Sequence, residues 1–301
     1  QRILAIPKII VYLLHIKPDI IIINSAANSR ALIVSKFFKK LLNSRIILYV
    51  HEYEEMFKAF KFLRKKTICL ADKLLVVNNN QREWIKKELK CNKNIFVVPN
   101  GINKEKVNLL TLEEPEDSFL NFIKNKFVIS IVGILTKIKG YDFLLSIIKS
   151  LKNQENMVFV IIGDFFNTKD KHGFTSDLYR YELDRKVYIT GITSNIFKYL
   201  KYSSCIAITS RSETFSRVAL EGMVIGIPIV AFNIRGLRET LPSEYPYLVS
   251  PFNTQEFSIR ILEIYNLSIE QKEHLKEILK GHSVKFDICK ISKIFWEEIL
   301  K

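Results

Sequence analysis

Short apolar runs alternate with longer amphipathic stretches along the whole chain. Most of the runs are continuously apolar, which is typical of strands that helices cover on both faces. The predicted strands are Asp19–Asn24, Arg45–Val50, Lys73–Asn78, Ile95–Val98, Phe127–Val132, Met157–Gly163, Lys186–Thr190, Ser204–Thr209 and Ile227–Phe232. The predicted helices between and after them are Ser29–Leu42, Gln81–Leu89, Gly140–Lys152, Asn195–Lys201, Ser216–Ile225 and Gln255–Tyr265. This alternation predicts an α/β protein with parallel sheets.

A domain boundary is expected in the middle of this pattern. Pro99–Ile102 is a turn signal, and Thr111–Ser118 carries acidic residues and proline without periodicity, before a new strand begins at Phe127. We therefore expect two Rossmann-like domains, 1–118 and 119–282, followed by a terminal segment, 283–301. In such architectures ligands bind at the carboxyl ends of the strands, often in the cleft between the domains.

The first domain is short for its class. It offers a helical stretch, Ile3–His15, and about four strands, whereas a doubly wound domain usually has five or six. The chain also begins at Gln1 rather than at methionine. We expect an N-terminal domain that is truncated.

Composition adds two constraints. Hydrophobic residues make up 48% of the 301 residues, which is enough for a sizeable core, and no apolar run reaches the roughly 18 residues that span a bilayer. The four cysteines are far apart and form no CxxC or Cys/His cluster, so we expect reduced thiols and no metal site.

The net charge of +15 indicates an anionic partner. Nucleic acid and an anionic membrane surface are both compatible with it. Basic and aromatic residues are mixed at Lys36–Lys40 and at Lys58–Lys66, and no nucleic-acid-binding motif accompanies them. The charge therefore favours a cytoplasmic protein held peripherally at the inner face of the membrane, although any single cluster is more often a solvated helix face.

The richest polar stretch runs from Ser204 to Glu239. Glu213 follows a strand and a polar loop and leads into a helix, whose free N–H groups and dipole suit a diphosphate. Glu221 comes eight residues later, and ionised carboxylates accept strong hydrogen bonds from sugar and ribose hydroxyls. A second loop, Arg235–Leu237, is expected to bring another backbone segment near the ligand.

This stretch resembles the donor-binding signature of the retaining GT-B glycosyltransferases of group 1. The resemblance rests on Glu213-(x7)-Glu221-Gly222-Met223 followed by Gly226-Ile227-Pro228. Other segments match the family in the same order, namely Pro99-Asn100-Gly101-Ile102, Val132-Gly133 with Lys139-Gly140, Ile161-Ile162-Gly163-Asp164 and Val187–Gly191. The family implies that the terminal helix, Ile288–Leu300, crosses back to the first domain. Its apolar positions Ile291, Ile294, Phe295 and Ile299 recur at helical spacing, which predicts one inward face.

The resemblance also implies roles for single residues. The implied catalytic residues are Glu213 on the sugar, Lys139 on the diphosphate and His51, which follows a strand of the first domain and faces the donor sugar. The family's arginine after the glycine is Ile134 here, so either Lys137 supplies the second positive charge or the diphosphate has fewer contacts. The remaining implied donor-binding residues are Gly133, Gly191, Ile192, Thr214, Phe215, Ser216, Glu221 and Gly236.

The implied reaction moves a hexose-type sugar from a nucleoside diphosphate to a hydroxyl with retention of configuration. The sugar nucleotide is a substrate, no cofactor is implied, and no metal is expected because the chain contains no Asp-x-Asp pair. A lipid-linked or saccharide acceptor in bacterial surface polysaccharide synthesis fits the family and the basic charge.

Several alternatives stay open at this point. A catalytically incomplete fragment could bind a sugar nucleotide or pair with a separate N-terminal half. An epimerase of the same fold would be distinguished by assays of donor consumption. A phosphorylase of the same fold would need a lysine site for its cofactor, and we find no such site in the sequence. A basic nucleic-acid-binding protein would show salt-dependent retention on DNA.

Overall fold

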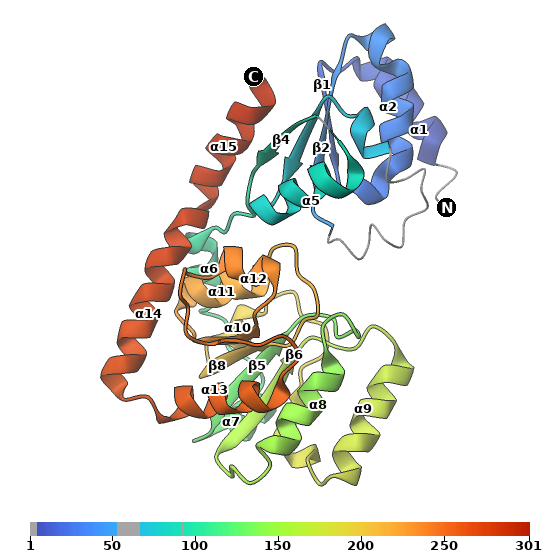
Figure 1. Cartoon of the computed structure of the whole chain (residues 1–301). Coiled ribbons are helices and arrows are strands. Elements are labelled where there is room, and N and C mark those ends of the chain that lie inside the picture. The colour runs from blue at the N-terminus through green and yellow to red at the C-terminus, as the bar shows by residue number, and fades with distance from the viewer. Residues whose placement is uncertain (1–4, 53–66, 92) are drawn as a thin grey trace. The chain divides into compact units, whose positions relative to one another are not determined.

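The computed structural model describes residues 5–52, 67–91 and 93–301. The chain forms two compact units, each built on its own parallel sheet (Figure 1). The first unit comprises Gln1–Gly101 and Cys289–Lys301, and the second comprises Ile102–Ile288. The point at which the sequence divides its two domains, after residue 118, thus lies within the second unit. The basic segment Lys58–Lys66 lies outside the described residues.

The first unit contains a four-stranded parallel sheet in the order β1-β2-β3-β4. Its strands are β1 (Ile20–Asn24), β2 (Arg45–Val50), β3 (Lys73–Val76) and β4 (Asn94–Val97). The helices among its described residues are α1 (Ala5–Ile16), α2 (Ser29–Leu42), α5 (Asn79–Leu89) and α15 (Ile288–Leu300), with the short 3-10 turns η1 (Ala26–Asn28) and η2 (Ile68–Leu70). The described strands and the amphipathic helices α2, α5 and α15 occupy the segments that the hydrophobic pattern predicts, with ends that differ by at most two residues.

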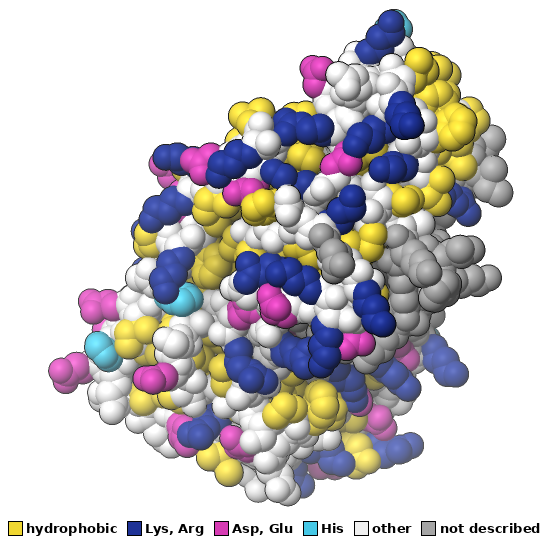
Figure 2. Space-filling view, turned by 45° about the horizontal axis from the view of Figure 1, so that its top comes forward, with side chains coloured by type: hydrophobic (Ala, Val, Ile, Leu, Met, Phe, Trp, Pro, Cys, Tyr) yellow, Lys and Arg dark blue, Asp and Glu magenta, His cyan; other side chains and the backbone are white. Residues whose placement is uncertain are grey.

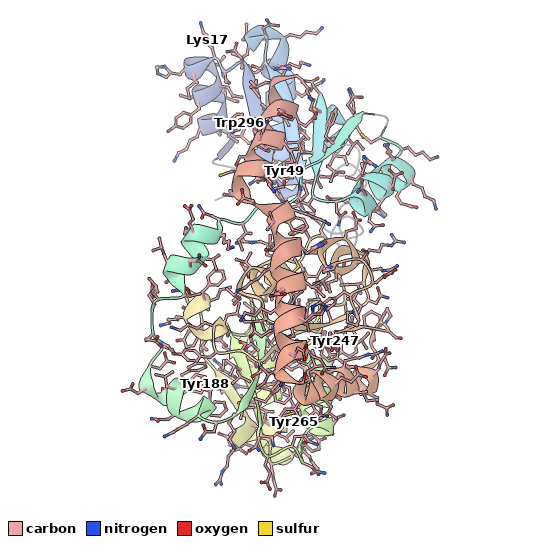
Figure 3. The ribbon with its side chains drawn as sticks, turned by 90° about the vertical axis from the view of Figure 1, so that its left-hand side faces the viewer. Lys17, Tyr49, Tyr188, Tyr247, Tyr265 and Trp296 are labelled. Carbon is pink, nitrogen blue, oxygen red and sulfur yellow. The ribbon has the colours of Figure 1, made fainter. Side chains whose placement is uncertain are left out.

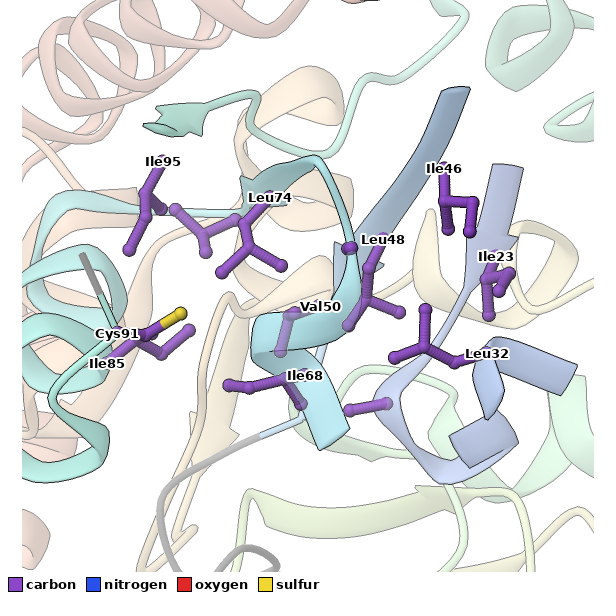
Figure 4. Close-up of a cluster of buried hydrophobic side chains, with 13 residues drawn as sticks. Ile23, Leu32, Ile46, Leu48, Val50, Ile68, Leu74, Ile85, Cys91 and Ile95 are labelled. Atoms are coloured by element: carbon purple, nitrogen blue, oxygen red, sulfur yellow. The ribbon is translucent and has the colours of Figure 1, made fainter. Parts of the chain in front are cut away.

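Strand β2 separates two hydrophobic cores because its successive side chains point to opposite faces of the sheet. Ile46, Leu48 and Val50 are buried on one face, in the cluster that α2 and α5 help to close (Figure 4). Ile47 points to the other face, where it packs with residues of α15. The continuous apolar run of this strand is therefore required by burial on both faces.

Helix α15 packs on that second face through residues four apart. Ile291 and Ile299 are buried there with Phe295 between them, and the Phe295 ring lies 6.0 Å from the ring of Tyr49 on β2. Figure 3 labels Tyr49 beside this helix. The Tyr49 hydroxyl donates a hydrogen bond of 2.5 Å to the Val98 carbonyl. Ile294, which the pattern placed inward, is 39% exposed, because a stripe of i, i+4 and i+8 positions already fills the contact with the sheet.

The second unit contains a six-stranded parallel sheet in the order β10-β9-β8-β5-β6-β7. Its strands are β5 (Phe127–Val132), β6 (Met157–Ile162), β7 (Val187–Ile189), β8 (Cys205–Ile208), β9 (Ile229–Phe232) and β10 (Leu248–Val249). Its helices are α6 (Lys104–Leu110), α7 (Asp117–Ile123), α8 (Tyr141–Ser150), α9 (Thr168–Arg180), α10 (Phe197–Leu200), α11 (Arg217–Ile225), α12 (Arg235–Thr240), α13 (Thr254–Asn266) and α14 (Ile269–Ser283). Two further 3-10 turns are η3 (Asp184–Lys186) and η4 (Val284–Phe286).

Five of these helices were not predicted, namely α6, α7, α9, α12 and α14. The segment Arg235–Leu237, expected as a loop, is the first turn of α12. Helix α14 begins with a capping box, in which Ser268 and Gln271 bond reciprocally to each other's backbone N–H groups, and this local signal was available in the sequence. No helix in the described part of the chain is long and apolar enough to cross a membrane.

Candidate functional site

The candidate site forms where the order in which the chain adds strands to the second unit's sheet reverses. From β5 the chain adds β6 and β7 on one side and then returns to place β8 and β9 on the other. The loops that leave the carboxyl ends of β5 and β8 therefore diverge from adjacent strands. Ligands of open parallel sheets bind at such switch points. The loop after β5 carries Lys139, and the loop after β8 carries Glu213.

Lys139 and Glu213 meet directly at this point. The Lys139 Nζ donates a hydrogen bond of 2.6 Å to Glu213 Oε1, and the Ser210 hydroxyl donates one of 2.8 Å to the same oxygen. The Thr209 hydroxyl, at the end of β8, bonds the Lys139 carbonyl at 2.8 Å. A small cavity beside the pair is lined by Ile131, Val132, Leu135, Lys139, Ala207, Ile208, Thr209, Ser210, Glu213 and Val218. The two predicted charges thus form one polar cluster.

Two glycines permit the close packing of these loops. Gly140 has a φ of +72°, and a Cβ at this position would lie 2.0 Å from the Thr209 carbonyl oxygen. A Cβ on Gly236, at the start of α12, would lie 2.1 Å from the Glu213 carbonyl oxygen. Both contacts involve backbone, which cannot move aside as a flexible side chain would. The missing side chain of Gly236 therefore allows the Glu213 loop to pack directly against α12.

Glu221 lies on α11, and the positive charge of Lys139 acts on it. Its side chain is only 12% exposed, and Arg217 approaches its Oε1 at 3.6 Å. Burial raises the pKa of the Glu221 carboxyl to about 7, while Arg217 and Lys139 act in the opposite direction. A carboxylate that is costly to ionise without a partner is well placed to accept hydrogen bonds from a ligand's hydroxyl groups.

The start of α11 is held by side chains from its own surroundings. The Ser216 hydroxyl accepts a hydrogen bond from the Ala219 N–H, and the Ser216 N–H donates to the Thr240 hydroxyl. The Phe215 ring is buried and packs 5.4 Å from the ring of Phe286. Any ligand contact of Phe215 would therefore come from its backbone. Thr214 precedes it in the loop between Glu213 and α11.

The predicted glycine positions follow strands at the same edge of the sheet. Gly133 comes after β5 with a φ of +122°, and Gly191 comes after β7 with a φ of +75°. A Cβ on either would meet nothing within 4 Å, so both backbones border open space. The Thr190 hydroxyl donates to the Gly191 carbonyl, and the next residue, Ile192, is 80% exposed. These positions leave room for a ligand against bare backbone.

Arg211 is a member of the cluster that the sequence analysis did not single out. Its guanidinium forms two hydrogen bonds, of 2.8 and 2.6 Å, with the Asp142 carboxylate and another of 2.5 Å with the Lys137 carbonyl. The backbone N–H of Arg211 donates to the Ile138 carbonyl at 2.7 Å. Arg211 thus ties the loop that carries Lys139 to the loop that carries Glu213. The sequence feature that could have indicated Arg211 was its position in a polar loop beside Ser210, three residues after a strand.

His51 lies in the first unit, at the end of β2. Its Nε2 lies 2.6 Å from Asn24 Oδ1, which assigns the ring proton to this nitrogen and leaves Nδ1 as an acceptor. Burial lowers the pKa of His51, although the neighbouring Glu52 carboxylate acts to raise it. The imidazole is therefore neutral near pH 7.

Two residues beside His51 were not predicted. Glu52 is buried and accepts hydrogen bonds from the Ser25 hydroxyl, from the Ala27 N–H at 3.0 Å and from the His51 N–H at 3.1 Å. Ser25 has a φ of +117°, a conformation that residues with side chains rarely adopt. Such strain is common at functional sites. Within residues 5–52, 67–91 and 93–301, no three His, Cys, Asp or Glu side chains are arranged to hold a metal ion.

Solved structures with the same fold define the class of this chain. Anabaena Alr3699/HepE, crystallised with UDP, is 19% identical, and the match covers 97% of this chain and 81% of that one with a TM-score of 0.82. Sucrose-phosphate synthase from Thermosynechococcus elongatus is 16% identical, with coverage of 97% and 76% and a TM-score of 0.81. The two parallel-sheet α/β domains are therefore a GT-B fold, as the sequence predicted.

Family models assign the chain more closely. Residues 113–281, more than half of the chain, match Glycosyl transferases group 1, and residues 1–106 match Glycosyltransferase Family 4. The chain belongs to the group 1 glycosyltransferases, as its Glu-x7-Glu stretch predicted.

Curated relatives agree with this assignment. The uncharacterized glycosyltransferase MJ1059 of Methanocaldococcus jannaschii is 27% identical over 90% of this chain and 73% of its own length. The amylovoran biosynthesis glycosyltransferase AmsD of Erwinia amylovora is 27% identical over 88% and 73%. The O-antigen biosynthesis glycosyltransferase WclY of Escherichia coli is 23% identical over 73% and 63%.

Proposed function

We propose that this protein transfers a hexose-type sugar from a nucleoside diphosphate to a hydroxyl acceptor, with retention of configuration. One observation carries the proposal, the contact of Lys139 with Glu213 at the switch point of the sheet in the second unit. A cation and a carboxylate at this place match the two ends of an activated sugar, a diphosphate with negative charge and a ring with hydroxyl donors.

Each charged group has a separate role in the proposal. Lys139 leaves the Glu213 carboxylate and neutralises the departing diphosphate, and Glu213 then accepts hydrogen bonds from the sugar hydroxyls. Glu221 accepts hydrogen bonds from the ribose, Lys137 adds positive charge, and the backbone at Gly191 and Ile192 holds the base. Support comes from Anabaena HepE, whose structures contain UDP, UDP with glucose, and UDP-glucose.

The proposed reaction breaks one bond and forms one bond on the same face of the sugar. The bond between the anomeric carbon and the diphosphate oxygen breaks, and the acceptor oxygen takes its place. The acceptor's proton passes to the departing phosphate oxygen, so the products are the glycoside and the nucleoside diphosphate. Lys139 favours this step because it stabilises the charge that develops on the leaving group. His51 is proposed to accept a hydrogen bond from a hydroxyl of the donor sugar through Nδ1 of its neutral ring.

The proposed biological setting is the assembly of bacterial surface polysaccharide. AmsD is named for amylovoran biosynthesis, WclY for O-antigen biosynthesis, and a Klebsiella pneumoniae relative for its place in a cps region. A growing saccharide or a lipid-linked saccharide is the corresponding acceptor. The donor is a substrate, and neither a cofactor nor a metal ion has a role in the proposed step.

A donor screen tests the proposal directly. The protein is incubated with UDP-, GDP-, ADP- and dTDP-linked hexoses and saccharide acceptors, and nucleotide release is measured together with product mass. The proton coupling constant at the anomeric carbon of the product reports retention or inversion. Donor binding without nucleotide release in the presence of any of the acceptors would instead support a protein that binds sugar nucleotides without transfer.

A further inference from the structure

Helix α2 exposes a row of large apolar side chains. Ile33, Phe37 and Leu41 are 49%, 82% and 71% exposed, and they are spaced four residues apart. At about 100° per residue this spacing places them along one side of the helix. The opposite side of α2 is buried through Leu32 and Ser35. The row is therefore separate from the face with which α2 covers its sheet.

Positive charges flank this row. Arg30, Lys36 and Lys40 lie on the same exposed side of α2 by helical position, and each is exposed. Neither α1 nor α2 contains a carboxylate, and Asp19 is the only acidic residue in the first 51 residues of the chain. Lys39, which lies closer to the sheet, pairs instead with Asp72 at 2.5 Å.

Basic residues elsewhere are arranged differently. On α14, lysines alternate with glutamates, and Lys276 pairs with Glu273 at 2.9 Å. Such a helix presents nearly balanced charge to solvent. The exposed side of α2 combines apolar side chains with unbalanced positive charge, which is the pattern of a helix that lies in the surface of an anionic bilayer.

Helix α1 extends the same chemistry, because it packs directly beside α2. It is rich in apolar residues, of which Val11, Tyr12 and Ile16 are 66%, 65% and 62% exposed. Figure 2 shows hydrophobic and basic side chains next to one another in the part of the first unit that contains α1 and α2. Tyrosine suits the boundary between lipid and water, because its ring is apolar and its hydroxyl is polar.

We propose that the exposed side of α2, formed by Arg30, Ile33, Lys36, Phe37, Lys40 and Leu41, docks on an anionic phospholipid bilayer. The apolar side chains enter the boundary of the acyl chains, and the lysines extend toward lipid phosphates along their own apolar stems. The charge selects a bilayer over a second copy of this chain, since two copies of this face would repel each other. This inference stands apart from the proposed transfer reaction, because bilayer binding is measured without donor or acceptor.

Vesicle flotation tests the docking surface. The full chain is mixed with vesicles of phosphatidylcholine alone and with vesicles of equal parts phosphatidylcholine and phosphatidylglycerol. We expect binding to the anionic vesicles, with weakening at high salt. The variant Phe37→Ser/Leu41→Ser should bind at least about tenfold more weakly, because apolar burial is lost. The variant Lys36→Gln/Lys40→Gln should bind about 25-fold more weakly, about fivefold for each lysine.

Matched controls remove the same chemistry from the second unit. Leu112→Ser/Phe166→Ser removes two apolar side chains that are 74% and 75% exposed, and Lys152→Gln/Lys169→Gln removes the same charge. Both controls should bind anionic vesicles like the parent protein, and circular dichroism should show native helix content in all four variants. Equal binding to neutral and anionic vesicles would overturn the proposal. So would undiminished binding of either α2 variant, or a loss of self-association in solution as the sole effect of the α2 changes.

Discussion

The Lys139 ammonium and the Glu213 carboxylate lie 2.6 Å apart, although 74 residues separate them in the chain. The lysine side chain is 33% exposed and the glutamate side chain 12% exposed. A partly exposed ion pair of this kind contributes at most about 1 kcal/mol to stability. Its contribution to ligand binding can be much larger, because in the proposed reaction the same groups bind a diphosphate and sugar hydroxyls.

This difference in magnitude gives the first prediction. Glu213→Ala and Lys139→Ala should each lower kcat/KM for sugar transfer by about 100-fold, as expected for the loss of a charge-assisted contact in the transition state. Each should change the free energy of unfolding by no more than about 1 kcal/mol. Steady-state kinetics and urea unfolding measure the two effects. The exposed pair Lys276–Glu273 is the matched control, and Glu273→Ala should leave kcat/KM unchanged. A Glu213→Ala protein with full activity would contradict the proposed site.

Gly236 provides a test of backbone placement. In Gly236→Ala the new Cβ would lie 2.1 Å from the Glu213 carbonyl oxygen, so the Glu213 loop must shift. We expect a loss of about 1–3 kcal/mol in the free energy of unfolding, the usual cost of overpacking, together with a fall in kcat/KM. Gly173→Ala on α9 is the control, because a Cβ there meets nothing within 4 Å and alanine favours a helix. It should be as stable as the parent protein or more stable, with unchanged kinetics.

The carboxyl of Glu221 predicts a dependence of stability on pH. Its pKa is about 7 in the folded protein, whereas the ordinary value of 4.5 applies to the unfolded chain. The folded protein therefore holds the proton more tightly. The stability contribution of this group is complete below pH 4.5 and is lost as the pH rises through 7. The loss amounts to at most about 3.5 kcal/mol, because each tenfold difference in proton affinity between the folded and unfolded states corresponds to about 1.4 kcal/mol.

Glu221→Gln tests this relation. Glutamine cannot ionise, so the variant should be more stable than the parent protein at pH 8 and about equally stable at pH 4. Donor affinity should fall about tenfold at pH 8, because an amide oxygen accepts a weaker hydrogen bond than a carboxylate. Urea unfolding and isothermal titration with the nucleotide measure the two quantities. A stability difference that is the same at both pH values would contradict the raised pKa. In Lys139→Ala the pKa of Glu221 should rise further, since Lys139 acts to lower it.

Arg211 predicts an effect on the Lys139 loop without direct contact with the substrate. Arg211→Ala removes the bidentate pair with Asp142 and the bond to the Lys137 carbonyl, so Lys139 loses its fixed position. We expect kcat to fall about tenfold with a smaller change in KM, and Arg211→Lys to restore little, because lysine lacks the planar fork. Arg180→Ala removes a looser Arg–Asp pair of 3.6 Å on α9 and should have no kinetic effect.

Most of the fold could be predicted from local pattern. Strand β5 is apolar apart from Ser130, and Ser216 stands where a helix cap is favoured, so the sequence indicated both elements. The short helix α12 was missed, because its six residues contain a glycine and show no apolar period. Ile294 was placed inward because periodicity alone does not say how many positions of a stripe the partner surface can cover.

The candidate site was predicted in part. Glu213 and Lys139 were named from the motif, and each lies in a loop that follows a strand of the second unit. Arg211 was not named, because its importance depends on Asp142 and Lys137, which the loop after β5 supplies. The buried Glu52 beside His51 was not named either, since only the paired strands β1 and β2 bring Ser25 to its carboxylate.

The sequence by itself determined which segments are buried on both faces, where α8, α11 and α13 begin to within one residue, and which family the chain resembles. These properties depend on neighbours within a few residues, so periodicity and motif spacing contain them. Only the tertiary structure decided that Lys139 pairs with Glu213, that Gly236 touches the Glu213 backbone and that Glu221 is costly to ionise. Those facts depend on the order of strands in the sheet and on the water that packing excludes, and no local pattern records either.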